Sequence, residues 1–201
     1  MTFESLLRLY QDRGSLQYSG EPVSQLEHAW QGLQLAQAAG ASPQLQLATF
    51  FHDVGHLLQK AMGSPTLVGH DDRHEVTGTA LLKRAFAQLG FSNEDQEAIA
   101  QPVALHVEAK RYLVYSEPSY EACLSADSIR SLALQGGPMD ESEAQRFERR
   151  SFFQDAVALR RWDEAAKQGA PEAALVLPSW GAVEGLLHQL VAQCTPTKLA
   201  S

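Results

Sequence analysis

The chain has 201 residues, of which 44% are hydrophobic, and this is enough for one domain with a single core. Its 16 basic and 24 acidic residues give a net charge of -8, which argues against general binding to nucleic acid or to an anionic membrane. The apolar runs are far shorter than the roughly 20 residues that span a bilayer. We therefore expect one domain over residues 1–201, ending in a frayed tail at about 196–201, with no nucleic-acid or membrane partner.

The N-terminus and the cysteines bear on the compartment. The first residues include Glu4 and lack the basic start, apolar run and small-residue cleavage site of a signal peptide. The two cysteines, Cys123 and Cys194, form neither a disulfide framework nor a CxxC metal motif. These features favour a reducing cytoplasm.

Helical periodicity begins at the N-terminus. Apolar residues at helical spacing predict a helix over residues 2–12. Ser24 and Glu27 have the spacing of a capping box, which predicts a second helix with His28 in its first turns.

A strongly apolar helix is predicted next. Ser42 and Pro43 supply an N-cap and a first-turn proline for the segment 44–60, QLQLATFFHDVGHLLQK. We expect His52 and Asp53 to lie on this buried central helix. A buried carboxylate is costly unless it is paired or bound to a metal, so Asp53 requires a partner.

Two further helices carry histidines. Asp72 and Glu75 have capping-box spacing, which predicts a helix that His74 opens. Ser92 is the expected N-cap of a long helix that carries His106.

The C-terminal half is also helical in pattern. Helical spacing predicts elements over residues 140–150, 151–167 and 180–194. Arg160 and Asp163 are three residues apart and therefore share a face of their helix. Because no segment shows the two-residue period of a strand, the predicted fold is an all-α helical bundle.

Histidine and aspartate side chains on these helices suit a metal site. Helical bundles build such sites from inward-facing ligands that are distant in sequence. Imidazole and carboxylate ligands without a thiolate cluster favour iron, manganese, nickel or zinc, and a set of six suits two metal ions. The candidates are His28, His52, Asp53, His74, His106 and Asp163. His70 and His188 lack a matching context, and we expect them to be structural or exposed.

The order H, HD, H, H and D of these candidates resembles the HD-domain superfamily, in its form with two extra histidines that hold a dinuclear site. A narrower resemblance lies in YSGEPVSQLEHA at 18–29, HDVGH at 52–56, HVEAKRYL at 106–113 and RRWDE at 160–164. These segments are similar to those of the mixed-valent di-iron oxygenases of organophosphonate breakdown, which are related to myo-inositol oxygenase. The resemblance covers most of the chain and implies an HD-domain helical bundle with a dinuclear metal site at its centre.

The resemblance implies the cofactors and their ligands. They would be two iron ions, Fe(II) and Fe(III), with O2 as co-substrate. The first iron would be held by His28, His52, Asp53 and Asp163, and the second by His74, His106 and the bridging Asp53. Tyr18 would occupy a metal position and gate its loop until the substrate arrives.

The implied substrate is a 1-hydroxy-2-(amino or trimethylammonio)ethylphosphonate, whose carbon–phosphorus bond would be cleaved with O2 to give phosphate and glycine or glycine betaine. Glu21 would contact an amino end, whereas a trimethylammonium end would prefer aromatic faces such as Tyr18, Tyr112, Tyr115 or Trp162. The groups expected to bind substrate are Tyr18, Glu21, His56, Lys110, Ser128 and Arg160. The choice between Arg160 and Arg161 stays open at this point.

Two other functions also stay open. A metal-dependent phosphohydrolase of the HD type would use the same ligands to activate water on a phosphomonoester or nucleotide, and would need neither Tyr18 nor O2. A non-catalytic HD module would use the metal only for stability. The residues alone predict a two-metal site, and the oxygenase chemistry follows from the resemblance.

Overall fold

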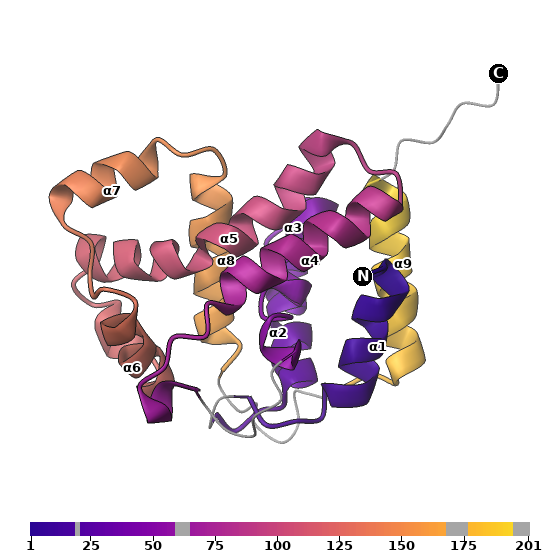
Figure 1. Cartoon of the computed structure of the whole chain (residues 1–201), viewed down its shortest axis with the longest axis horizontal. Helices are drawn as coiled ribbons and strands as arrows, with labels where there is room; N and C mark the ends of the chain where they lie inside the picture. The colour runs from indigo at the N-terminus through magenta and orange to yellow at the C-terminus, as the bar shows by residue number, and fades with distance from the viewer. Residues whose placement is uncertain (19–20, 59–64, 168–176, 195–201) are drawn as a thin grey trace.

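The computed structural model describes residues 1–18, 21–58, 65–167 and 177–194, and helices make up its regular structure (Figure 1). The α-helices are α1 (Phe3–Arg13), α2 (Gln25–Ala38), α3 (Pro43–Phe51), α4 (His74–Gln88), α5 (Asn93–Ser116), α6 (Ala126–Leu134), α7 (Glu141–Glu148), α8 (Phe153–Ala165) and α9 (Trp180–Cys194). Short 3-10 helices are η1 (His56–Leu58), η2 (Pro65–Val68) and η3 (Glu121–Cys123). Among these residues, β pairing is limited to an isolated bridge between Gln17 and Ser24. The prediction of an all-α fold is confirmed.

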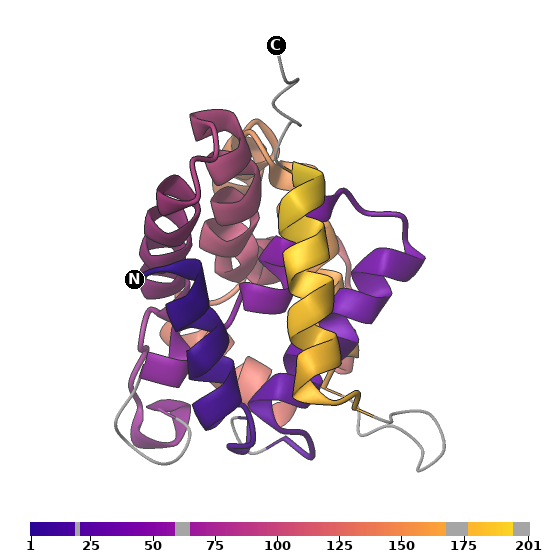
Figure 2. The ribbon, with the colours of Figure 1, turned by 90° about the vertical axis from the view of Figure 1, so that its right-hand side faces the viewer.

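Helix α3 lies in the interior of the bundle. Leu47, Phe50 and Phe51 on this helix are fully buried and belong to the largest apolar cluster. Helices α2, α5 and α9 pack against α3, and α5 in turn packs against α4 and α8. Figure 2 shows α1 and α9 side by side on the face away from α7. This packing holds the end of α3 inside the molecule.

Three predicted helix starts are confirmed by their capping contacts. The Ser24 hydroxyl accepts the Glu27 N–H while the Glu27 carboxylate accepts the Ser24 N–H, which completes a capping box on α2. Ser42 and Ser92 cap α3 and α5. These side chains satisfy N–H groups that a helix start leaves unpaired.

The central helix is shorter than predicted. It ends just before His52, so His52 and Asp53 lie in the following turn and not on the helix. The His52 Nδ1–H donates to the Thr49 carbonyl at 2.8 Å and satisfies one of the terminal acceptors of α3. A Cβ on Gly55 would lie 2.2 Å from the carbonyl oxygen of His74, so only glycine lets the turn approach α4 so closely.

The capping box predicted for α4 is wrong. The N-cap position is Arg73, with a left-handed backbone (φ 49°) and no side-chain cap. The Asp72 carboxylate accepts from His74 instead, at 3.3 Å from its N–H and 2.9 Å from its Nδ1. The Glu75 Oε2 atom is buried and accepts no hydrogen bond from the described residues. Asp72 therefore holds the imidazole of His74 as well as the start of the helix.

The remaining sequence predictions concern the cysteines and the tail. Cys123 is exposed and Cys194 is buried, and both thiols are free. In the described part of the chain, no helix combines the length and apolar character needed to cross a bilayer. The tail predicted at about 196–201 lies outside the described residues.

Candidate metal centre

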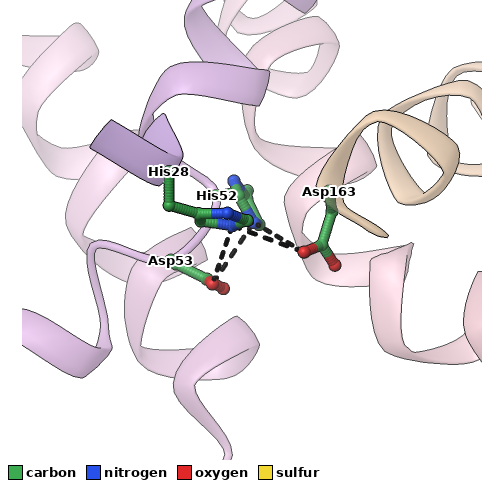
Figure 3. A group of neighbouring side chains, drawn as sticks. All are labelled: His28, His52, Asp53 and Asp163. Carbon is green, nitrogen blue, oxygen red and sulfur yellow. Dashed lines mark hydrogen bonds and ion pairs between the residues drawn. The ribbon is translucent and has the colours of Figure 1, made fainter. Parts of the chain in front are cut away.

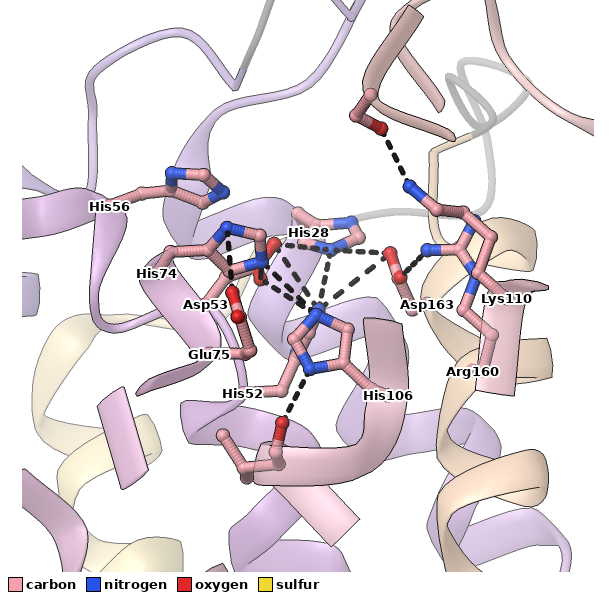
Figure 4. A network of polar contacts seen from close by, with 12 residues as sticks. His28, His52, Asp53, His56, His74, Glu75, His106, Lys110, Arg160 and Asp163 are labelled. Atoms are coloured by element: carbon pink, nitrogen blue, oxygen red, sulfur yellow. Dashed lines mark hydrogen bonds and ion pairs between the residues drawn. The ribbon is translucent and has the colours of Figure 1, made fainter. Parts of the chain in front are cut away.

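The six predicted ligands meet inside the bundle, next to the end of α3. They come from α2, the turn after α3, the start of α4, the middle of α5 and the last turns of α8. All are buried, with exposed fractions between 0% for His52 and 9% for His74. Figure 4 shows their side chains pointing toward one another.

His28, His52, Asp53 and Asp163 form the first group (Figure 3). The Nε2 atoms of the two histidines are 3.3 Å apart. Asp53 Oδ2 lies 3.7 Å from His28 Nε2 and 3.3 Å from His52 Nε2, and Asp163 Oδ1 lies 3.4 and 3.7 Å from the same two atoms. Two nitrogens and two carboxylate oxygens thus surround one point.

His74 and His106 form the second group together with the other oxygen of Asp53. Their Nε2 atoms are 3.1 Å apart. Asp53 Oδ1 lies 3.4 Å from His74 Nε2 and 3.8 Å from His106 Nε2. The two oxygens of one carboxylate therefore face two different histidine pairs, as they do in a ligand that bridges two ions.

Each of the four imidazoles is held through its Nδ1 atom. Backbone carbonyl oxygens accept from three of them: His28 contacts Ala166 at 3.3 Å, His52 contacts Thr49 at 2.8 Å, and His106 contacts Val103 at 2.7 Å. The Nδ1 atom of His74 contacts the carboxylate of Asp72 at 2.9 Å. An acceptor at Nδ1 keeps the proton there and leaves the lone pair of Nε2 facing the centre. The surrounding chain thus selects the tautomer that can bind a metal.

The carboxylates also fit a metal. Asp53 Oδ1 is buried and accepts no hydrogen bond from the described residues, whereas the buried Asp163 Oδ1 has the Lys167 ammonium 3.1 Å away. An unpaired carboxylate oxygen is costly to bury, and a metal cation offsets that cost. Imidazole nitrogens with carboxylate oxygens suit iron, manganese, nickel or zinc, and do not suit copper(I) or an iron–sulfur cluster. The residues present therefore fit a pair of such ions.

The protonation states point the same way. Burial alone would raise the pKa of Asp53, but the imidazole of His52 and its neighbours hold it well below its usual range. Burial lowers the pKa of His28 and of His106. Burial opposes a proton on His52, yet the carboxylates of Asp53 and Asp163 raise its pKa to about 10. The two carboxylates thus favour a positive charge at this centre, which a metal cation could supply.

Tyr18 lies against the first group. Its hydroxyl donates to Asp53 Oδ2 at 2.6 Å, and its ring stacks on that of His28 with the centroids 4.0 Å apart. Burial, followed by the charge of Asp53, raises the pKa of this phenol well above its ordinary value. Tyr18 is therefore a protonated donor here, and its role as a metal ligand stays a prediction.

A cavity of about 40 Å³ opens beside the metal groups. Five of the six predicted substrate-binding residues line it: Tyr18, His56, Lys110, Ser128 and Arg160. Glu21 is half-buried and lies outside this lining. His70 is exposed, as expected, but also contributes to the lining.

The basic side chains of the cavity differ in their partners. Lys110 is 4% exposed and donates to Ser131 Oγ at 2.6 Å. Burial, together with the nearby cations Arg160 and Lys167, lowers the pKa of Lys110 to about 7. His56 stacks on His74 and contacts a carboxylate oxygen of Asp72 at 2.6 Å.

The open choice between two arginines has a clear structural answer. Arg160 is 3% exposed and lines the cavity, where it pairs with Asp163 and Glu164. Arg161 is exposed and pairs with Glu117. Figure 4 shows Arg160 and Lys110 beyond Asp163, on the side away from the histidines.

Two residues of this region were missed at the level of sequence. Lys167 Nζ lies 3.1 Å from Asp163 Oδ1, 3.1 Å from Glu164 Oε2 and 2.9 Å from Ser128 Oγ. Glu164 also accepts from Ser128 Oγ at 2.9 Å and from the backbone N–H of Ser125 at 2.6 Å. The available signal was spacing, because Lys167 follows Asp163 by four residues and can share its helix face.

Comparison with known proteins agrees with this geometry. The HD domain family matches residues 26–139. Hydroxymethylphosphonate dioxygenase of Gimesia maris is 39% identical over 81% of this chain and 77% of its own length. The 1-hydroxy-2-(trimethylamino)ethylphosphonate dioxygenase of Leisingera caerulea, described as glycine-betaine-forming, is 36% identical over 82% of this chain and 79% of its own. An uncharacterised protein of Acanthamoeba polyphaga mimivirus is 32% identical over 81% and 71%.

These matches confirm the resemblance that the order of histidines and aspartates predicted. The family match contains His28 to His106, the relatives align with about four fifths of the chain, and two of them are named as phosphonate dioxygenases. The protein therefore belongs to the HD-domain family and is a relative of its phosphonate dioxygenases.

Proposed function

We propose that this protein is an iron-dependent oxygenase that cleaves the carbon–phosphorus bond of a 1-hydroxyphosphonate with O2 and releases inorganic phosphate. The observation that carries the proposal is the position of Asp53, whose two oxygens face two separate histidine pairs. A two-ion site of this kind, in a chain related to phosphonate dioxygenases, supports an oxygenase.

Two iron ions, Fe(II) and Fe(III), are the proposed cofactors. Their ligands are His28, His52, Asp53 and Asp163 for one ion, and His74, His106 and Asp53 for the other. When bound, the ions supply the activation of O2 and a Lewis-acid anchor for the substrate. The chain supplies ligand orientation through the Nδ1 contacts and a buried setting that keeps bulk water from the reacting carbon.

The phosphonate group is proposed to bind beside the metal groups. Lys110 is suited to this role because no carboxylate pairs with it among the described residues, and an anion beside it would favour its charged form. Arg160 and Ser128 provide further donors, and His56 lies across the cavity from them. These contacts orient the carbinol carbon toward the ions and compensate the charge of the phosphate that leaves.

The substituent on the carbinol carbon is proposed to be small. The predicted contact for an amino end, Glu21, lies outside the cavity lining. Of the aromatic side chains considered for a trimethylammonium end, Tyr18 lines the described cavity while Tyr112, Tyr115 and Trp162 do not. The absence of Glu21 from the lining favours hydroxymethylphosphonate, the substrate in the name of one relative, over the amino substrate.

The phosphohydrolase and the non-catalytic module have weaker support. Both would tolerate this ligand set, but neither requires O2, whereas the relatives that carry a functional name are dioxygenases. A comparison with and without O2 therefore separates all three.

The test uses iron-loaded, reduced protein with the three hydroxyphosphonates and with a phosphomonoester, under air and under argon. We expect phosphate to be released from a hydroxyphosphonate only under air, fastest from hydroxymethylphosphonate, and no hydrolysis of the phosphomonoester. Release that persists under argon would contradict the oxygenase and support a phosphohydrolase. Absence of release from every compound would support the non-catalytic module.

A further inference from the structure

Lys167 is a buried cation for which the proposed reaction has no role. It follows the end of α8 and is only 7% exposed. Its ammonium lies between Asp163, Glu164 and Ser128, and 5.9 Å above the ring of Tyr18. Lys167 lines the same cavity as Lys110, so an anion bound in this cavity would lie close to both ammonium groups.

Lys167 shares one carboxylate oxygen with the first metal group. Asp163 Oδ1 lies 3.1 Å from Lys167 Nζ and 3.4 Å from His28 Nε2. Arg160 pairs with the other oxygen, Oδ2. A metal ion held by the first group would bind Asp163 Oδ1 and would repel the Lys167 ammonium, which contacts the same oxygen. Metal binding therefore competes with Lys167 and leaves the contact of Arg160 in place.

The competition changes the net charge of the groups around Lys167. The cations Arg160 and Lys167 face the carboxylates Asp163 and Glu164, so the charges of these four groups balance. A metal ion takes up the charge of Asp163, and the remaining three groups then carry one net positive charge. A metal ion in the first group would therefore leave the ammonium of Lys167 available to a phosphonate, in addition to that of Lys110.

We propose that Lys167 is a further anion-binding residue, which Asp163 holds in the metal-free protein and which turns to the phosphonate once a metal ion occupies the first group. This inference rests on the metal centre of the proposed function. It makes metal and oxyanion binding mutually favourable, because each ligand relieves a contact that opposes the other. The role of Lys167 is to bind the anionic end of the substrate.

The test measures binding without turnover. Inorganic phosphate serves as the oxyanion and manganese(II) as the metal, and calorimetry gives the affinity of phosphate for metal-free and manganese-loaded protein. Manganese affinity is measured separately. The variants are Lys167→Met, which keeps much of the length and loses the charge, and Lys167→Arg, which keeps the charge. Arg161→Gln is the matched control, because Arg161 is an exposed cation of α8 whose partner is Glu117.

We expect Lys167→Met to weaken phosphate binding about tenfold in the loaded protein and to have little effect without metal. Manganese should bind Lys167→Met at least as tightly as the wild type, because a competing cation is gone. Lys167→Arg should stay within about threefold of the wild type for phosphate, as should Arg161→Gln.

A merely structural lysine gives a different pattern. If Lys167→Met lowers manganese and phosphate affinity together, or leaves phosphate binding by the loaded protein unchanged, the inference is overturned. If Lys167→Met does not fold, Lys167→Gln takes its place under the same criteria. Because no step uses O2, an inactive enzyme that still shows the expected linkage would count against the proposed function alone.

Discussion

A carboxylate that bridges two metal ions must present its oxygens in different directions from a fixed backbone. Asp53 meets this requirement because it stands in a tight turn between the end of α3 and η1. The hydroxyl of Tyr18 donates to Oδ2 at 2.6 Å, while Oδ1 accepts no hydrogen bond from the described residues. The two oxygens therefore differ, and an ion bound to Oδ1 would displace no donor from it.

Lys110 provides a stability test at the scale of one residue. Its pKa of about 7 lies below the ordinary value near 10.4, so between about pH 7 and 10 the unfolded chain holds a proton that the folded chain has lost. The unfolding free energy then rises with pH across this window, and burying the charge costs most below pH 7. Lys110→Met should therefore stabilise the metal-free protein at pH 6 by on the order of 1–3 kcal/mol. Urea unfolding measures this difference.

The advantage of Lys110→Met should shrink as the pH rises toward 10, because the lysine then loses its charge. Arg161→Gln is again the control, since its exposed ion pair contributes little. A destabilised Lys110→Met at pH 6, or an advantage that does not change with pH, would contradict the description of Lys110 as a strained buried cation.

The residues of the site were predictable from sequence to different degrees. The metal candidates could be chosen because their order along the chain is a recognisable motif, and the structure brings all of them together. Lys167 had no motif, and its position depends on the packing of α8 against α5. Glu21 was assigned through the resemblance alone, and the structure places it outside the cavity lining.

At the scale of elements, the turn after α3 docks on the start of α4. Gly55 makes this possible, because its missing side chain would meet the backbone carbonyl of His74 at 2.2 Å. The contact brings Asp53 and His74 together as ligands of the second metal group. The point at which α3 ends therefore determines that Asp53 lies in this turn, next to α4.

Gly55→Ala should lower the unfolding free energy by about 3 kcal/mol or more, because the added Cβ meets backbone and cannot be relieved by a rotamer change. Gly185→Ala is the matched control in α9, where nothing lies within 4 Å of the added carbon. Alanine should stabilise that helix by about 0.5–1 kcal/mol. Thermal or urea unfolding compares the two. Equal stabilities for Gly55→Ala and the wild type would contradict the close approach.

Helix starts were easier to predict than helix ends. Ser24, Ser42 and Ser92 act through local hydrogen bonds that a short sequence pattern reveals. The end of α3 depends on the contact between Gly55 and α4, which is distant in sequence. The start of α4 departed from its pattern because Asp72 serves the imidazole of His74.

At the scale of the whole molecule, the bundle surrounds a polar centre. All-α architecture was predictable because the apolar period repeats along the chain and each helix needs a buried partner. The arrangement of the helices around α3 could not be predicted, since many ways of packing the helices bury the same apolar faces. The centre brings the carboxylates of Asp53 and Asp163 together with two histidines, which is the kind of site that a metal cation binds.

Metal binding should therefore stabilise the whole fold. Manganese(II) at a thousand times its dissociation constant should add about 4 kcal/mol to the unfolding free energy, because it binds the folded centre and not the dispersed ligands of the unfolded chain. Calorimetric melting with and without manganese measures this effect. Asp163→Ala should show a much smaller gain, and Arg161→Gln the full gain. Equal melting temperatures with and without the ion would contradict the metal centre.

The most direct measurement is the iron content of the loaded protein, with its electron paramagnetic resonance spectrum, for the wild type and Asp53→Ala. With two ions joined by Asp53, the wild type should bind two iron atoms per chain and give the signal of a coupled Fe(II)–Fe(III) pair after partial reduction. Asp53→Ala should bind at most one iron and lose that signal. Two irons with a coupled signal in Asp53→Ala, or a single iron in the wild type, would contradict the bridging role of Asp53.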